Sequence, residues 1–354
     1  MVGPPIWSFN KGGRDMLRNV VLGAVAVVAT AAAAYPAIAQ DALVFALVPK
    51  NVNNPFFDVA RDGCKKAEAE MAGKIECLYI GPGEHGGGEE QVQMVNDLIV
   101  KGVDGIAVSA ANAAAMASAL QAAKQAGIPV ITWDADLLEK DKALRTAYVG
   151  TKNYDIGVNL AKLVQQLKPQ GGTIALQSGG AAAANHNERL QGIRDTLSGE
   201  KSKDAPGVKL TGQNGWTEIA GSPLYTDDDP NKAVQQLEDT LLKETDLDAY
   251  ISTGAFTQWL PDAYKNAVKS VKDRIASKDL ALVVADTLPV QMELLVGGYS
   301  LGQVGQRPFE MGYKSMYFLY DMVKNGKNPE DPTYTGLDVC TPDTAKTCIG
   351  GGGA

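Results

Sequence analysis

Amide, ammonium and aromatic side chains gather in a short segment that follows an apolar run near the start of the chain. The run covers residues 43–48, and the segment after it contains Lys50, Asn54, Phe56 and Phe57. A continuous apolar run is typical of a parallel strand that is buried on both faces. The carboxyl ends of such strands bind ligands in open α/β sheets. Amides beside aromatic rings suit a molecule with hydroxyl groups on one side and C–H groups on the other, such as a sugar or polyol.

Two aspartates stand at the same kind of position further along the chain. Asp134 follows an apolar run that ends at Trp133, and Asp286 follows one that ends at Ala285. A carboxylate held there can accept hydrogen bonds from neighbouring hydroxyl groups, each worth roughly 1.5–3 kcal/mol. The alternative is that each aspartate only caps the helix or turn that follows. We interpret both as candidate hydroxyl acceptors.

Two further polar clusters lie in loops of the second half. Residues 185–189 open a predicted helix, and residues 227–229 are three aspartates in a row. Helix capping explains the first cluster equally well, and a solvated acidic loop is the favoured interpretation of the second. His186 can in principle act as a base, but no serine or cysteine nucleophile motif accompanies it. We therefore expect a hydrogen-bonded surface histidine.

A glycine motif at residues 81–86 matches the G-x-G-x-x-G pattern of dinucleotide-binding loops. It follows the second predicted strand, Pro82 removes a backbone donor, and further glycines delay the helix that would hold pyrophosphate. We predict a flexible loop and no cofactor. No metal site is expected either, because no C-x-x-C spacing occurs and the only histidines are His85 and His186.

Alternating apolar and amphipathic segments predict the elements that position these side chains. Strands are expected at residues 43–48, 75–80, 105–109, 129–133, 173–177, 208–213, 249–252 and 280–285. Helices are expected at residues 56–72, 89–101, 113–126, 155–167, 187–198, 231–243, 259–270 and 308–325. Two consecutive βαβαβ series predict an α/β fold with two doubly wound parallel-sheet lobes, whose strand ends face each other across a cleft.

The amino-terminal residues have the features of an export signal. Residues 19–34 are almost wholly apolar, basic residues precede them, and a small-x-small site ends at Ala39 before Gln40. We expect a signal peptide over residues 1–39, cleaved near Ala39-Gln40, with translation starting at Met16. A membrane anchor is the alternative, but the apolar run is near the lower limit for a membrane span.

Length, charge and cysteine content narrow the class of protein further. A chain of 354 residues exceeds what one hydrophobic core usually organises, so two domains are expected. The net charge of −8 argues against nucleic acid or an anionic membrane surface as partner. Cys64 with Cys77 and Cys340 with Cys348 are disulfide candidates in an exported chain. Four cysteines allow three connectivities, among which short loops favour this local pairing.

Three segments, placed in order, resemble those of the periplasmic sugar-binding proteins of ABC importers. They are Asn-Asn-Pro-Phe-Phe at 53–57, Gly-Ile-Pro-Val-Ile-Thr-Trp-Asp at 127–134 and Gln-Val-Gly-Gln at 303–306. The resemblance covers essentially all of residues 42–340 and is to the ribose-binding and autoinducer-2-binding branch. It implies the type I periplasmic binding protein fold, with two lobes joined by a three-segment hinge. The expected domains are an N-terminal lobe (40–150 with 307–331), a C-terminal lobe (151–306 with 332–349) and a disordered tail (350–354).

The resemblance also implies which residues contact the ligand. The ribose-type pattern places these positions at the ligand: Asn54, Phe56, Phe57, Asp134, Asn187, Gly254, Asp286 and Gln306. Lys50, Asp134 and Ala255 fit the autoinducer-2 pattern, whose other contact positions correspond to Asn185, His186 and Thr253. Ribose binders have arginines where this chain has Ala135 and Asn187, and an asparagine where it has Gly254. The autoinducer-2 branch has other polar residues at Asn185 and His186 and a proline at Thr253. The ligand is therefore expected to be a third solute. A second group of candidate contacts is Asp136, Asn185, Asp228, Thr253 and Ala255.

These observations predict the solute-binding component of an ABC transporter, which binds a small sugar or polyol in the periplasm. The expected partners are the transmembrane subunits of a permease with its cytoplasmic ATPase, and the chain is expected to be a monomer without catalytic activity. One alternative is a periplasmic sensor that presents a sugar-like signal to a chemoreceptor or kinase. Another is an exported hydrolase that uses His186 with the acidic loop. A transcriptional repressor with a similar two-lobed core is excluded, because it would need a DNA-binding domain at the position of the predicted signal peptide.

Overall fold

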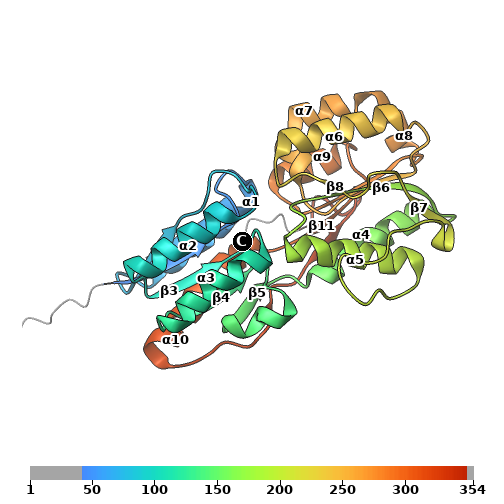
Figure 1. Cartoon of the computed structure of the whole chain (residues 1–354). Helices are drawn as coiled ribbons and strands as arrows, with labels where there is room; N and C mark the ends of the chain where they lie inside the picture. The colour runs from blue at the N-terminus through green and yellow to red at the C-terminus, as the bar shows by residue number, and fades with distance from the viewer. Residues whose placement is uncertain (1–41, 349–354) are drawn as a thin grey trace, which may run out of the picture. The chain divides into compact units, whose positions relative to one another are not determined.

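The computed structural model describes residues 42–348, which form two β-sheets, each with its own set of helices (Figure 1). The predicted signal peptide, the start at Met16 and the predicted tail at 350–354 lie outside the described residues. Among the described residues, no helix is long and apolar enough to span a membrane.

The first sheet has six strands in the order β12-β5-β4-β3-β1-β2, and every pair is parallel. Its strands are β1 (Leu43–Val48), β2 (Ile75–Tyr79), β3 (Gly105–Val108), β4 (Val130–Trp133), β5 (Ala147–Gly150) and β12 (Thr333–Tyr334). Its helices are α1 (Pro55–Glu70), α2 (Glu89–Lys101), α3 (Ala113–Gln125), the short η1 (Glu139–Leu144) and α10 (Pro308–Asn325).

The apolar run of β1 is buried on both faces of this sheet, as its sequence predicts. Phe45 and Leu47 belong to a core with α1 and α10, whereas Ala46 and Val48 belong to a second core with α2 and α3. Side chains alternate between the two faces of a strand, so each face of β1 contributes to a different core. The carboxyl end of β1 is thereby held rigidly at the sheet edge where the polar segment begins.

The second sheet has strand order β13-β11-β10-β9-β6-β7, with β8 paired to β6. Its strands are β6 (Gly172–Ser178), β7 (Trp216–Glu218), β8 (Leu224–Tyr225), β9 (Ala249–Ser252), β10 (Ala281–Ala285), β11 (Gly302–Gly305) and β13 (Asp338–Cys340). Its helices are α4 (Asn153–Leu167), α5 (Ala184–Ser198), η2 (Gln213–Gly215), α6 (Pro230–Lys243), η3 (Phe256–Trp259), α7 (Pro261–Ala267), η4 (Lys269–Val271), α8 (Lys272–Ala276) and α9 (Pro289–Val296). The pairing of β13 with β11 is antiparallel, and the other pairs are parallel.

Two of the predicted elements are wrong. The strand expected at 208–213 is not formed: Val208 is 66% exposed, and the strand of this region begins at Trp216. Gly212 and Gly215 have φ of 129° and 80°, which lets the chain turn back so that the Glu218 N–H donates to the Leu210 carbonyl. The helix expected at 259–270 is broken into η3, α7 and η4, and Pro261 begins α7.

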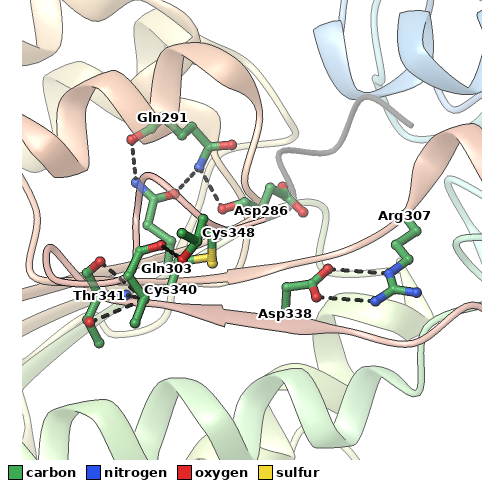
Figure 2. Close-up of a disulfide and its surroundings, with 10 residues drawn as sticks. Asp286, Gln291, Gln303, Arg307, Asp338, Cys340, Thr341 and Cys348 are labelled. Atoms are coloured by element: carbon green, nitrogen blue, oxygen red, sulfur yellow. Dashed lines mark hydrogen bonds and ion pairs between the residues drawn. A yellow bond between two sulfur atoms is a disulfide. The ribbon is translucent and has the colours of Figure 1, made fainter. Parts of the chain in front are cut away.

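The chain crosses between the two sheets at three places. The crossings follow β5, β11 and β12, and the boundaries expected at residues 150 and 306 lie at or next to the ends of β5 and β11. The third lies after Tyr334 and not between 331 and 332, because Thr333 and Tyr334 pair with β5 of the first sheet. Arg307, just after the second crossing, donates to Asp338 just after the third, as Figure 2 shows. This pair ties two of the hinge segments together.

Both disulfides have the local connectivity that the short loops favoured. Cys64–Cys77 joins α1 to β2, and Cys340–Cys348 joins β13 to the segment after it (Figure 2). No cysteine in the described part of the chain is free. The disulfide candidates are confirmed.

Candidate functional site

The carboxyl ends of strands from both sheets supply side chains to one cavity with an empty volume of about 260 Å³. Ten of the candidates from the sequence line it: Lys50, Asn54, Phe56, Phe57, Asp134, Asn185, Asp228, Gly254, Asp286 and Gln306. Four more residues line it: His186, which corresponds to a contact position of the autoinducer-2 pattern, and Arg189, Phe256 and Trp259, which were not among the candidates. The sequence therefore located most of the cavity wall, and the structure adds one face of it.

The first turn of α1 forms the aromatic part of the wall. Asn54 is the N-cap of this helix, and its Oδ1 accepts from the Phe56 N–H at 2.9 Å, which leaves the amide N–H groups as donors. Phe56 packs edge-to-face on Phe57, and Phe57 packs in the same way on Trp133, each with ring centroids 5.4 Å apart. Trp133 itself is fully buried in the core, so it supports the phenylalanines and does not line the cavity.

Asp134 is held by partners from both lobes. Its backbone has φ of 56°, a left-handed conformation that is uncommon outside glycine and that occurs often at functional sites. Ser109 Oγ donates to Asp134 Oδ2 at 2.7 Å, and Lys50 Nζ lies 3.7 Å from the same oxygen. From α5, Arg189 Nη2 lies 3.7 Å from Asp134 Oδ1. Two cations thus compensate a buried carboxylate, as burial of a charge requires.

Arg189 has its side chain fixed by two other groups. Its Nε and Nη2 donate to Asn153 Oδ1 at 2.9 and 2.8 Å, and its Nη1 donates to the Thr253 carbonyl at 2.8 Å. Asn153 begins α4, directly after the first crossing between the sheets. The guanidinium therefore connects the hinge, the end of β9 and the cavity.

Asp286 is the corresponding carboxylate of the second lobe, again with a left-handed backbone (φ of 74°). Its Oδ1 accepts from Gln306 Nε2 at 2.8 Å and its Oδ2 from the Ala255 N–H at 3.3 Å. Gln291 donates to its backbone carbonyl at 3.1 Å, a contact visible in Figure 2. Burial raises the pKa of Asp286 above its ordinary value, although Arg189 and Gln306 act in the opposite direction.

Four of the candidates from the sequence do not line the cavity. Asn187 points away, and its Nδ2 donates to the Ala181 carbonyl at 2.8 Å. Asp136 accepts from the Arg145 guanidinium at 2.8 and 2.7 Å in the hinge region. Thr253 and Ala255 lie behind the wall, where they contact His186 and Asp286, respectively.

His186 and Asp228 correct two of the sequence interpretations. Neither is on the surface or in a solvated loop, because His186 is 3% and Asp228 7% exposed. In the acidic run, Asp227 pairs with Lys232 and Asp229 caps α6, whereas Asp228 lines the cavity. Because the three aspartates are adjacent and of the same type, the sequence did not show that only Asp228 lines the cavity.

Three polar atoms of the cavity wall are buried and have no hydrogen-bond partner: Asp228 Oδ1, Gln306 Oε1 and Trp259 Nε1. Buried polar groups in native proteins are nearly always paired, and an unpaired one costs about 1–3 kcal/mol. Two of these atoms are acceptors and one is a donor. A ligand that carries several hydroxyl groups supplies both kinds of partner.

Comparison with known proteins agrees with this geometry. The sequence pattern of the periplasmic binding protein domain matches residues 45–328. The chain belongs to this family. It is 28% identical over 183 residues to the D-ribose/D-allose-binding protein of Pseudomonas aeruginosa, a match that spans 49% of this chain and 54% of that protein. It is 22% identical over 307 residues to the ribose import binding protein RbsB of Salmonella typhimurium, covering 87% of this chain and 92% of that protein.

A solved structure shows the same fold. It is an ABC transporter solute-binding protein from Burkholderia graminis in complex with D-arabinose, with a TM-score of 0.72 and 28% identity over 86% of this chain and 97% of that chain. The expected family and the two-lobed α/β fold are thereby confirmed. Proteins of this family are periplasmic binding components and not enzymes, so the comparison gives no support to the hydrolase alternative.

Proposed function

We propose that the chain is the solute-binding component of an ABC importer and that it binds one small sugar in the cavity between its two lobes. The observation that carries this proposal is that a single small cavity combines carboxylates, amides and aromatic rings from both lobes. The chain delivers the sugar to the transmembrane subunits of a permease that has a cytoplasmic ATPase. It acts as a monomer in the periplasm.

The charge of the cavity supports a neutral monosaccharide or polyol. Its charged groups are the carboxylates of Asp134, Asp228 and Asp286 and the cations of Lys50 and Arg189. Positive charge is not in excess, so a phosphorylated or acidic sugar is disfavoured.

The proposed roles follow from the hydrogen-bonding capacity of each group. Asp134 and Asp286 accept from hydroxyl groups, and Lys50 donates to one. Asn54 and Gln306 supply amide groups, and Phe56 or Phe57 offers a ring face to the C–H side of the sugar. Closure is ligand-driven, since only a closed cleft lets both lobes contact the sugar and supplies the required difference in affinity.

The relatives support a sugar ligand of pentose or hexose size. The names of two of them specify ribose or allose, and the Burkholderia graminis structure contains D-arabinose. This chain has its own combination of cavity residues, so the sugar has to be found by screening.

A thermal-shift screen of the chain without its signal peptide tests the proposal. The panel is D-ribose, D-arabinose, D-allose, D-fucose, D-tagatose and myo-inositol, with ribose 5-phosphate as the charged control. A ligand that binds only the native state stabilises it, by about 2.7 kcal/mol at a concentration of 100 Kd. We expect a rise in Tm with at least one neutral member and none with the phosphate. No shift with any neutral member, together with no heat of binding in calorimetry, would contradict the proposal.

A further inference from the structure

His186 and Asp228 face each other across a small gap in the cavity wall. Asp228 Oδ1 lies 3.7 Å from His186 Nε2, which is too far for a direct hydrogen bond. Both side chains are more than nine-tenths buried, and Asp228 Oδ1 has no hydrogen-bond partner. Since both residues line the cavity, the missing partner is expected from the cavity side.

The hydrogen bonds behind His186 determine which ring nitrogen carries the proton. Thr253 Oγ1 donates to Ser178 Oγ at 3.2 Å, so its hydrogen is already used. Thr253 Oγ1 is also 3.0 Å from His186 Nδ1 and must accept from it. The proton therefore lies on Nδ1, and Nε2 presents a lone pair to the cavity.

The charge state of the ring agrees with this assignment. Burial, together with the charges of Lys50, Arg189 and His85, holds the pKa of His186 well below its ordinary value, so the ring is neutral at pH 7. His186 Nε2 and Asp228 Oδ1 are then two acceptors that face each other. No hydrogen bond can form between them, and each needs a donor from a third group.

Gly179, the residue after β6, packs directly against the two acceptors. A Cβ there would collide with Asp228 Oδ1 and would lie 2.6 Å from His186 Nε2. A methyl group at this position would therefore displace one or both side chains. The glycine lets both acceptors keep their positions in the cavity wall.

We propose that His186 Nε2 and Asp228 Oδ1 bind two adjacent hydroxyl groups of the ligand, one each, and so select a vicinal diol over a deoxy sugar. The separation of 3.7 Å between the acceptors suits donors on neighbouring carbon atoms, which lie close together on a sugar ring. This inference rests on the proposed function and adds to it the feature of the sugar that this part of the wall recognises.

Calorimetric titration with deoxy sugars tests the proposal. The parent sugars are D-ribose, D-arabinose and D-allose, and each that binds is compared with its monodeoxy analogues. With the wild-type chain, removal of one or other of two adjacent hydroxyl groups lowers affinity by about tenfold or more, the range for a hydrogen bond to a charged group. In Asp228→Ala the parent binds about tenfold more weakly, and one of these two analogues no longer differs from it.

Asp227→Ala is the matched control. Asp227 is the exposed neighbour that pairs with Lys232, so its removal leaves the affinities for parent and analogues within about twofold of wild type. Urea unfolding of each variant shows whether it is folded. The proposal is overturned if the ratio between parent and every analogue is the same in Asp228→Ala as in the wild type.

Gly179→Ala provides a second variant, because it keeps the chemistry of both acceptors but its Cβ would push one or both out of position. We expect at least a tenfold loss of affinity for the parent sugar, whereas Gly83→Ala, whose Cβ would meet no atom within 4 Å, has no effect. Unchanged binding by Gly179→Ala overturns the proposal. So does tighter binding of a 2-amino-2-deoxy sugar than of its parent, since an ammonium group would then be the preferred donor. If no sugar binds the wild type, the proposed function fails as well; if sugars bind with unchanged ratios, only the diol assignment fails.

Discussion

Lys50 Nζ donates a hydrogen bond to Asn185 Oδ1 at 2.9 Å and so joins the loop after β1 to the first turn of α5. The ammonium group is 1% exposed, and its other charged neighbour is Asp134 at 3.7 Å. Because burial of an unpaired charge is costly, these contacts hold Lys50 in place between the lobes. The residue at the end of the first strand therefore links the lobes beside the proposed sugar site.

Replacement of Lys50 by methionine, which keeps the volume but not the charge, tests this link. We expect the affinity for the cognate sugar to fall by about tenfold or more, because the contact with Asn185 and one compensating charge near Asp134 are lost. Small-angle scattering of the sugar-free protein should show a larger radius of gyration. Lys66→Met is the matched control, since Lys66 is exposed and pairs only with Glu70 on the same helix. Equal affinity in Lys50→Met and Lys66→Met would contradict this role.

Apolar runs predicted the strands that carry the site. The bounds of β1 and β9 match the sequence prediction, because each run is buried on both faces and ends where polar residues begin. The glycine-containing strands β5 and β11 were not predicted as elements, since four residues with glycine at one or both ends give too weak a pattern. They form because their neighbours in the sheet supply the pairing.

Arg189 shows why a part of the site was missed. The ribose-type pattern placed Asn187 at the ligand, and the autoinducer-2 pattern placed Asn185 and His186 there. The structure places Asn185, His186 and also Arg189 on the cavity side of α5, but not Asn187. Residues 185 and 189 are one helical turn apart and share a face, and residue 187 lies on the opposite side. The helix begins at Ala184, three residues earlier than expected, and its orientation against the cavity could not be derived from spacing alone. A helical-face analysis of 184–198 would have selected Arg189.

The buried neutral His186 makes stability depend on pH. Its pKa is well below the ordinary value of 6.5 in the folded protein, mainly because of burial and also because of Lys50, Arg189 and His85; Asp228 is the acidic group that faces it. Below about pH 6.5 the unfolded chain takes up a proton that the native ring does not, so the free energy of unfolding falls by up to about 1.4 kcal/mol per pH unit.

Urea unfolding of the wild type and His186→Gln between pH 5 and pH 8 measures this effect. We expect the two curves to run parallel above about pH 7.5 and the wild-type curve to fall more steeply below pH 6.5. Identical slopes over the whole range would mean that the imidazole is not held neutral. The imidazole C–H resonances in NMR spectra, of which the chain has two pairs, give a direct second reading.

Glu188, also in α5, is expected to act in the opposite direction. Burial raises its pKa to about 7, with Lys142 lowering it and Asp136 raising it. The native state therefore keeps a proton that the unfolded chain has released, and stability falls as pH rises from about 4.5 to about 7. Glu188→Gln should raise the free energy of unfolding at pH 8 by on the order of 1–3 kcal/mol and have little effect at pH 4.5. A destabilised variant at pH 8 would show that the carboxylate has a favourable partner.

The disulfide between Cys64 and Cys77 is expected to contribute to stability but not to binding. It connects positions 13 residues apart in α1 and β2, both in the core of the first lobe, and neither cysteine lines the cavity. Removal of a disulfide that closes a loop of this size lowers the free energy of unfolding by about 3 kcal/mol, because the unfolded chain gains conformational entropy. In Cys64→Ser/Cys77→Ser, the urea midpoint should fall accordingly and the sugar affinity should stay within about twofold. A large loss of sugar affinity in a folded double variant would contradict this prediction, because it would show that the disulfide contributes to binding.

The most direct test of the account is calorimetric titration of residues 40–354 with each neutral sugar of the panel, using wild type, Asp134→Ala and Asp58→Ala. Asp134 contacts groups of both lobes at the cavity, whereas Asp58 pairs with Arg61 on the half-exposed side of α1. The account predicts one bound sugar per wild-type chain, an affinity at least about tenfold weaker for Asp134→Ala, and no change for Asp58→Ala. No binding of any sugar by the wild type, or equal binding by Asp134→Ala and wild type, would contradict it.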